Sequence, residues 1–131
     1  MPEVNYIAVA LAALSAFLLG GLWYSPALFA NQWMRLTGQD EDTLKSGNMA
    51  VIFGAAFLLN LLAAYVLAMF LGPMPLKYAT LAGLSVGLCW VATSLGVNYL
   101  FERRPLGLWL INAGYFVLQF TIMGAIIGAF N

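Results

Sequence analysis

The sequence predicts an all-α membrane protein: one domain, residues 1–131, with four transmembrane helices in an up-and-down bundle and a short interfacial helix between the first two. Apolar residues make up 63% of the chain and charged residues only 8%, whereas soluble domains contain roughly half and a quarter. The charged residues also leave four long uncharged stretches, each near the ~20 apolar residues that a spanning helix needs. A soluble globule would carry charges along every helix.

The first predicted helix covers about residues 4–24. We interpret it as a retained helix and not as a removable signal peptide. Its flank carries Glu3 and no Lys or Arg, and its apolar run is longer than the apolar region of a typical signal.

A short helix is predicted over about residues 26–36, just after the first span. Phe29, Trp33 and Leu36 follow one another at i, i+4 and i+7, a spacing that indicates a helix lying in the interface with its apolar side towards lipid. Residues 39–46 then form the one clearly water-facing stretch, and we interpret the acidic run 40–42 as the solvated start of a short loop helix and not as a cation site.

The remaining spans are predicted at about residues 49–71, 76–101 and 106–130. The segment Gly72-Pro73-Met74-Pro75 breaks the chain between the second and third spans, and Pro105 opens the fourth at its first position. Because both connections are short, we expect the second and third spans, and the third and fourth, to be antiparallel neighbours.

The loop charges predict the orientation. Arg35, Lys45, Arg103 and Arg104 lie on one side of the membrane, against Lys77 alone on the other. Since Lys and Arg favour cytoplasmic loops, we expect both termini to lie outside the cytoplasm.

Small residues recur at four-residue spacing on three of the spans, a pattern that lets helix backbones approach closely in lipid. The spacing indicates either packing within the bundle, which we favour, or the seam of a homodimer. The candidate helix-packing residues are Ala8, Ala12, Ala16, Gly20, Gly83, Gly87, Gly124 and Gly128.

Polar and aromatic residues are predicted to gather at the cytoplasmic end of the bundle, where Asn98 and Asn112 should lie at similar depth and could hydrogen-bond. Asn112, Tyr115 and Gln119 form a polar stripe on the fourth span, and Asn60 is near the middle of the second. Such a cluster indicates either structural hydrogen bonding or a substrate path. We interpret Glu102 as a salt-bridged anchor beside the arginines. The candidate polar cluster is Trp23, Tyr24, Ser25, Asn98, Glu102 and Asn112.

Several function classes have no support in the composition. The chain has no histidine and one cysteine, Cys89, so the usual ligands of zinc, haem and iron–sulfur clusters are missing and no cofactor is predicted. The chain has no histidine that could act as a base and activate Ser25 or Cys89, and we do not expect an enzyme. The formal net charge is zero, which argues against a nucleic-acid partner.

Three segments resemble a known family. Gly20-Gly-Leu-Trp-Tyr-Ser-Pro26 with Phe29 and Trp33, Asn98-Tyr-Leu-Phe-Glu-Arg-Arg-Pro105, and Ile111-Asn-Ala-Gly-Tyr115 are similar to the uncharacterised bacterial membrane family called domain of unknown function 1761. The resemblance covers nearly the whole chain. It implies a small multi-pass protein of the bacterial inner (cytoplasmic) membrane, and it assigns no functional residues.

We expect the lipid bilayer to be the protein's main partner. Two functional hypotheses follow. The first is a compact homo-oligomeric transporter or channel-like protein, since four helices alone enclose little space. The alternative is an accessory or structural subunit that packs onto a larger membrane protein complex. An enclosed cavity lined by polar groups would favour the first, and complete internal pairing of those groups would favour the second.

Overall fold

The computed structural model describes residues 4–40, 42 and 47–131, and in these residues the chain is all-helical. Glu3, Glu41 and Lys45, on which parts of the predictions for the N-terminal flank, the acidic loop and the orientation rest, lie outside the described residues. The helical elements are α1 (Tyr6–Trp23), α2 (Ala30–Thr37), α4 (Met49–Leu71), α5 (Leu76–Val86), the π-helical segment η1 (Gly87–Ala92), α6 (Thr93–Glu102) and α7 (Leu106–Ala129).

Four helices are long and apolar enough to cross a membrane: α1, α4, the continuous helix Leu76–Glu102 and α7. The prediction of an all-helical fold with four such helices and a short helix between the first two is therefore confirmed. The apolar side of the short helix does not face lipid as predicted, because Phe29, Trp33 and Leu36 lie against Trp23, Tyr24 and Gly107 of the same chain. That helix begins later than expected, at Ala30, because the chain after Ser25 first makes a turn in which the N–H groups of Leu28 and Ala30 both donate to the Ser25 carbonyl.

The helix ends follow local chemistry. The Asn5 side chain accepts hydrogen bonds from the N–H groups of Ile7 and Ala8 at the start of α1, and Asn48 accepts one from Val51 at the start of α4; both are common N-cap interactions. Pro105 stands one position before α7, not at its first residue as predicted, and its missing N–H costs the helix nothing there.

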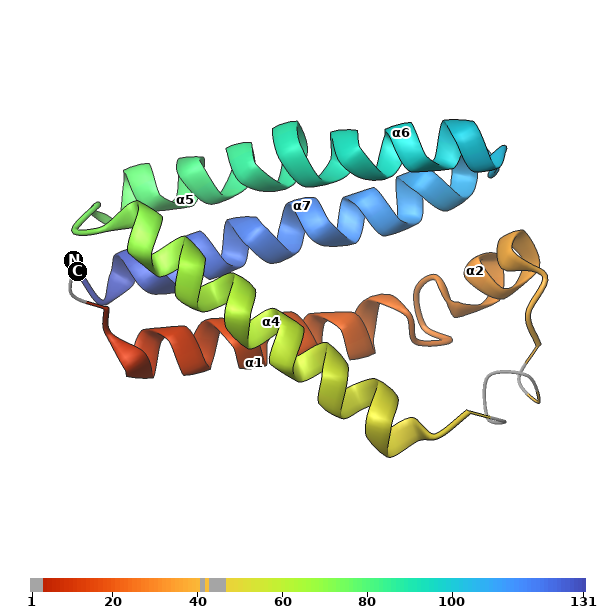
Figure 1. The fold of residues 1–131 in the computed structure, drawn as a ribbon, viewed down its shortest axis with the longest axis horizontal. Coiled ribbons are helices and arrows are strands. Elements are labelled where there is room, and N and C mark those ends of the chain that lie inside the picture. The colour runs from red at the N-terminus through yellow and green to blue at the C-terminus, as the bar shows by residue number, and fades with distance from the viewer. Residues whose placement is uncertain (1–3, 41, 43–46) are drawn as a thin grey trace.

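The helix α7 is the centre of the molecule. The helix formed by α5, η1 and α6 runs along one side of α7, and α1 runs along the other (Figure 1). Every other helix contacts α7, so this one helix organises the packing of the chain.

The helix α4 departs from the predicted arrangement. The second and third spans are predicted to be antiparallel neighbours, but α4 packs mainly on α1 and touches α5 only slightly. It crosses the molecule steeply and diverges at its N-terminal half (Figure 1), and its buried residues all lie in the other half: Ala64, Leu67, Ala68 and Leu71. The physical reason is that the small-residue face of α5 is already occupied by α7.

Small residues form the closest contacts in the structure. A Cβ atom added to Gly83 would overlap the backbone carbonyl of Phe120, and one added to Gly124 would overlap that of Ala79. At Gly87 the added atom would lie 2.8 Å from the Val117 Cα. These distances leave no room for a side chain, so α5 and α7 touch backbone to backbone, as membrane helices with small residues can.

The other small-residue positions also face helices of the same chain. Ala8, Ala12 and Ala16 are buried. A Cβ atom on Gly20 would lie 3.2 Å from the Tyr115 hydroxyl, and one on Gly128 would lie 2.6 Å from the Ala79 Cβ. All eight candidate packing residues thus lie at contacts within one chain.

The π-helical segment changes the register of the third span. The residues that face α7 are Gly83, Gly87, Ala92 and Gly96, with one step of five between Gly87 and Ala92. A π segment accommodates one extra residue, which in a regular helix would turn the following side chains by about 100°. The extra residue therefore decides which side chains of α6 meet α7.

Candidate functional site

A cavity of about 540 Å³ lies between α2 and the neighbouring ends of α1, α6 and α7. Its size falls within the usual range of small-molecule sites. Most of its described wall is apolar or aromatic, and the polar groups in it are two tyrosine hydroxyls, one asparagine amide and the indole N–H of Trp33. The lining residues are Tyr24, Pro26, Ala30, Trp33, Met34, Tyr99, Asn112 and Phe116.

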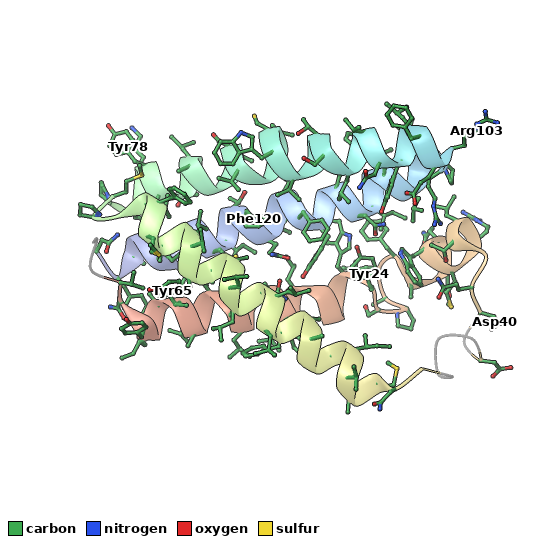
Figure 2. The ribbon with its side chains drawn as sticks, in the orientation of Figure 1. Tyr24, Asp40, Tyr65, Tyr78, Arg103 and Phe120 are labelled. Carbon is green, nitrogen blue, oxygen red and sulfur yellow. The ribbon has the colours of Figure 1, made fainter. Side chains whose placement is uncertain are left out.

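Two hydrogen bonds join the polar side chains of Tyr24, Asn112 and Tyr99 in the wall. Tyr24 follows directly after α1 and lies between α1 and α7 (Figure 2). Its hydroxyl donates to the Asn112 Oδ1 atom at 2.6 Å, and the Asn112 Nδ2 atom donates to the Tyr99 hydroxyl at 2.8 Å. These two hydrogen bonds connect the end of α1 to α7 and α7 to α6.

Aromatic contacts attach α2 to this end of the molecule. The rings of Tyr24 and Trp33 meet edge to face with centroids 6.1 Å apart, and the rings of Trp23 and Phe29 lie 4.8 Å apart. The indole N–H of Trp23 donates to the Ile111 carbonyl at 2.9 Å. The wall that α2 contributes is therefore held by specific contacts.

Burial raises the pKa of the Tyr24 hydroxyl above its usual value, and the hydroxyls of Tyr115 and Tyr99 act in the same direction. A tyrosine is protonated at neutral pH even at its usual pKa of about 10, and burial extends the protonated range of Tyr24 to higher pH. The Tyr24 hydroxyl can act as the donor to Asn112 without titrating.

The predicted polar cluster is only partly assembled. Trp23, Tyr24 and Asn112 come together, while the Ser25 hydroxyl bonds locally to the Leu22 carbonyl. Asn98 and Glu102 are exposed. Within the described residues no hydrogen bond joins Asn98 to Asn112, because Tyr99 occupies that position.

The ion pair expected of Glu102 with Arg103 or Arg104 is also not formed within the described part of the chain. All three side chains are exposed at the end of α6, and Arg103 adopts a left-handed backbone conformation, with φ 58°, that ends the helix. An exposed ion pair adds little stability, so leaving this pair unformed costs the chain little.

A family model described as "Protein of unknown function (DUF1761)" matches residues 7–128, nearly the whole chain. The chain belongs to the DUF1761 family. It matches no curated protein and no solved structure.

Tyr99 is the site residue of this DUF1761 protein that sequence reasoning missed. With regular helical spacing, the face of Gly87 continues towards Asn98. The extra residue in η1 moves that face by one position, so that it continues through Ala92 and Gly96 to Tyr99. Tyr99 also lines a second, smaller cavity of about 300 Å³ with Trp109 and Arg104, so it borders both spaces.

Deeper in the DUF1761 protein, α7 carries two further polar side chains. The Tyr115 hydroxyl donates to the Ala16 carbonyl at 2.8 Å, and the Gln119 Nε2 atom donates to the Asn60 Oδ1 atom at 3.3 Å. Gln119 is 2% exposed, and its Oε1 atom has no partner within the described chain. The pair joins α4 to α7 but leaves one buried acceptor unsatisfied.

The described residues of the DUF1761 protein contain no group of three or more His, Cys, Asp or Glu side chains that could hold a metal ion. Cys89 is exposed. The arrangement at the α2 cavity is suited to binding an uncharged molecule by apolar contact and hydrogen bonds.

Proposed function

We propose that this DUF1761 protein is a multi-pass protein of the bacterial inner membrane that binds a small molecule in the α2 cavity, as the solute site of a homo-oligomeric transporter or channel-like protein. The observation that carries the proposal is a cavity wall in which aromatic side chains surround a hydrogen-bonded polar chain, Tyr24, Asn112 and Tyr99. Few polar groups in an apolar pocket is the usual composition of a ligand site. The proposal assigns no catalytic reaction.

The need for more than one copy follows from the packing. The helix α7 fills the centre of the chain: it touches α5 backbone to backbone at Gly83 and Gly124, and its Met123 side chain is 0% exposed. A solute that left the α2 cavity would therefore move along the outside of this bundle. In a homo-oligomer, a second copy would supply the opposite wall of that route.

The proposed orientation places both termini outside the cytoplasm and the α2 cavity near the cytoplasmic face. Arg35, Arg103 and Arg104 support it, since all three belong to the end of the molecule that holds the cavity. The cavity would then open where the bilayer meets the cytoplasm.

The alternative is an accessory subunit of a larger membrane complex, and the geometry of α4 favours it. An apolar groove of about 460 Å³ lies between α4 and the α5–η1 helix, with Phe70 and Trp90 at its wall. Both side chains are largely exposed, at 80% and 70%. A helix of another membrane protein could pack there.

The experiment that tests the two functions is extraction in a mild detergent followed by native mass spectrometry. A homo-oligomer that retains a small molecule supports the solute-site proposal, particularly if the molecule is lost from an Asn112→Leu variant. A stoichiometric foreign polypeptide supports the alternative. A monomer that carries neither would contradict both.

A further inference from the structure

The hydrogen bonds among Tyr24, Asn112 and Tyr99 at the α2 cavity leave two hydrogen-bond donors unused. The Tyr24 hydrogen is committed to the Asn112 Oδ1 atom, and one Nδ2 hydrogen of Asn112 is committed to the Tyr99 oxygen. A side-chain amide nitrogen carries two hydrogens, and a tyrosine hydroxyl that accepts still has its own to donate. Within the described chain no acceptor takes the Tyr99 hydroxyl hydrogen. The Tyr99 hydroxyl and the second Asn112 N–H are therefore two free donors close together.

Charge gives the second constraint on a ligand. None of the described residues that line the cavity is charged. A ligand with a full charge would leave water without gaining a counter-ion, which is costly. The occupant should be neutral and should carry an acceptor.

Shape gives the third constraint. Three aromatic side chains besides Tyr24 line the same space: Trp33, Tyr99 and Phe116. Aromatic walls favour a flat ring through offset or edge-to-face contact. The Trp33 ring already meets Tyr24 in this way, at an interplanar angle of 74°.

We propose that the α2 cavity binds a neutral, flat ring that bears a carbonyl group, the chemistry of a quinone headgroup, with the carbonyl oxygen accepting from the Tyr99 hydroxyl and the free Asn112 N–H. This inference rests on the proposed function, because it names the class of molecule that the cavity takes. An apolar tail on such a ring would extend into the bilayer beside α2.

A quaternary ammonium ion is the rival that aromatic walls also attract, through cation–π contact. The free hydrogens of Tyr99 and Asn112 argue against it, since they present positive ends of dipoles to the cavity. Among the described residues that line the cavity there is also no carboxylate that would balance the charge.

The test compares two flat molecules of matched shape, naphthoquinone and naphthalene, by isothermal titration calorimetry of the full chain in detergent, with empty micelles as the blank. Naphthoquinone should bind more tightly by roughly threefold to tenfold, the effect of a hydrogen bond of about 1 kcal/mol. Tyr99→Phe should remove most of this preference, because it keeps the ring and deletes only the hydroxyl. Tyr78→Phe is the control, an exposed tyrosine at the opposite end of the molecule from Arg103 (Figure 2).

The outcomes separate the inference from the function on which it rests. Equal binding of the two molecules, or a preference that survives in Tyr99→Phe, overturns the inference and leaves a solute cavity standing. Tighter binding of tetraethylammonium than of naphthoquinone also overturns it. Failure of all three to bind the wild-type chain counts against the solute site itself. The comparison with the wild-type chain decides the question even if Tyr99→Phe does not fold.

Discussion

The hydroxyl of Tyr24 donates a 2.6 Å hydrogen bond to the side-chain carbonyl of Asn112, a residue 88 positions further along the chain. This contact joins the first membrane span to the last, because it connects the end of α1 to the first half of α7. Asn112 then passes the connection to Tyr99 on α6. One asparagine therefore links three spans at the end that holds the cavity.

Tyr24→Phe should lower the stability of the chain by about 1 kcal/mol, since hydrogen bonds between membrane helices average ~0.6 and reach ~1.7 kcal/mol. The ring contacts with Trp33 and Tyr115 remain, so the change isolates the hydroxyl. The measurement is the thermal unfolding midpoint in detergent. Tyr6→Phe, at a side chain that is 71% exposed, serves as the control, and an equal loss there would rule out the assigned role of Tyr24.

Gly83→Ala should be far more damaging than Gly54→Ala. The new methyl group at Gly83 would collide with the Phe120 backbone carbonyl, whereas no atom of the described residues would lie within 4 Å of one at Gly54. Overpacking of this kind costs ~1–3 kcal/mol or more, while alanine at an open helical position is neutral or stabilises by up to ~1 kcal/mol. The readouts are the yield of folded protein and its thermal midpoint. Similar behaviour of the two variants would mean that α5 and α7 do not touch as described.

The four spans could be predicted because the signal for them is repeated along the chain. Every uncharged stretch is long enough to cross a bilayer, and prolines mark the connections. The α5–α7 seam was also visible, since glycines at four-residue spacing have few other uses in lipid. The divergence of α4 was not predictable in this way. Nothing in its uniformly apolar surface says which side contacts protein and which contacts lipid.

The candidate site was predictable only in part, and the reason is a change of helical register in the third span. Trp23, Tyr24 and Asn112 were identified because polar and aromatic side chains near a span end need partners. Asn98 was chosen over Tyr99 because a helix was assumed to keep one period throughout. A one-residue change of register exchanges neighbouring side chains at the contact, and the π segment has no sequence signal strong enough to reveal it.

The Asn60 and Gln119 pair predicts a non-additive mutant cycle. Asn60→Leu should destabilise the chain by ~1–3 kcal/mol, because Gln119 is buried and would then lose its hydrogen-bond partner. The double variant Asn60→Leu, Gln119→Leu should recover much of this loss, since it also removes the unpartnered Oε1 atom. Thermal midpoints of the four proteins give the coupling. Additive losses would indicate that the two amides do not interact.

Deletion of a single residue tests the register that η1 sets. Deleting Trp90, which is 70% exposed and lies inside η1, should convert the π segment into regular helix. It would leave Ala92, Gly96 and Tyr99 on the face towards α7, because the step of five from Gly87 becomes a step of four.

Deleting Val97 is the matched control, since this side chain is also exposed, at 53%, but lies beyond η1. It should turn Tyr99 away from Asn112 by about 100°. We therefore expect the Trp90 deletion to keep a near-wild-type thermal midpoint and the naphthoquinone preference. The Val97 deletion should lose both, with a destabilisation of at least ~1 kcal/mol from the broken Tyr99 hydrogen bond. If the two deletions were equally harmful, the extra residue in η1 would not be what selects Tyr99 for the contact.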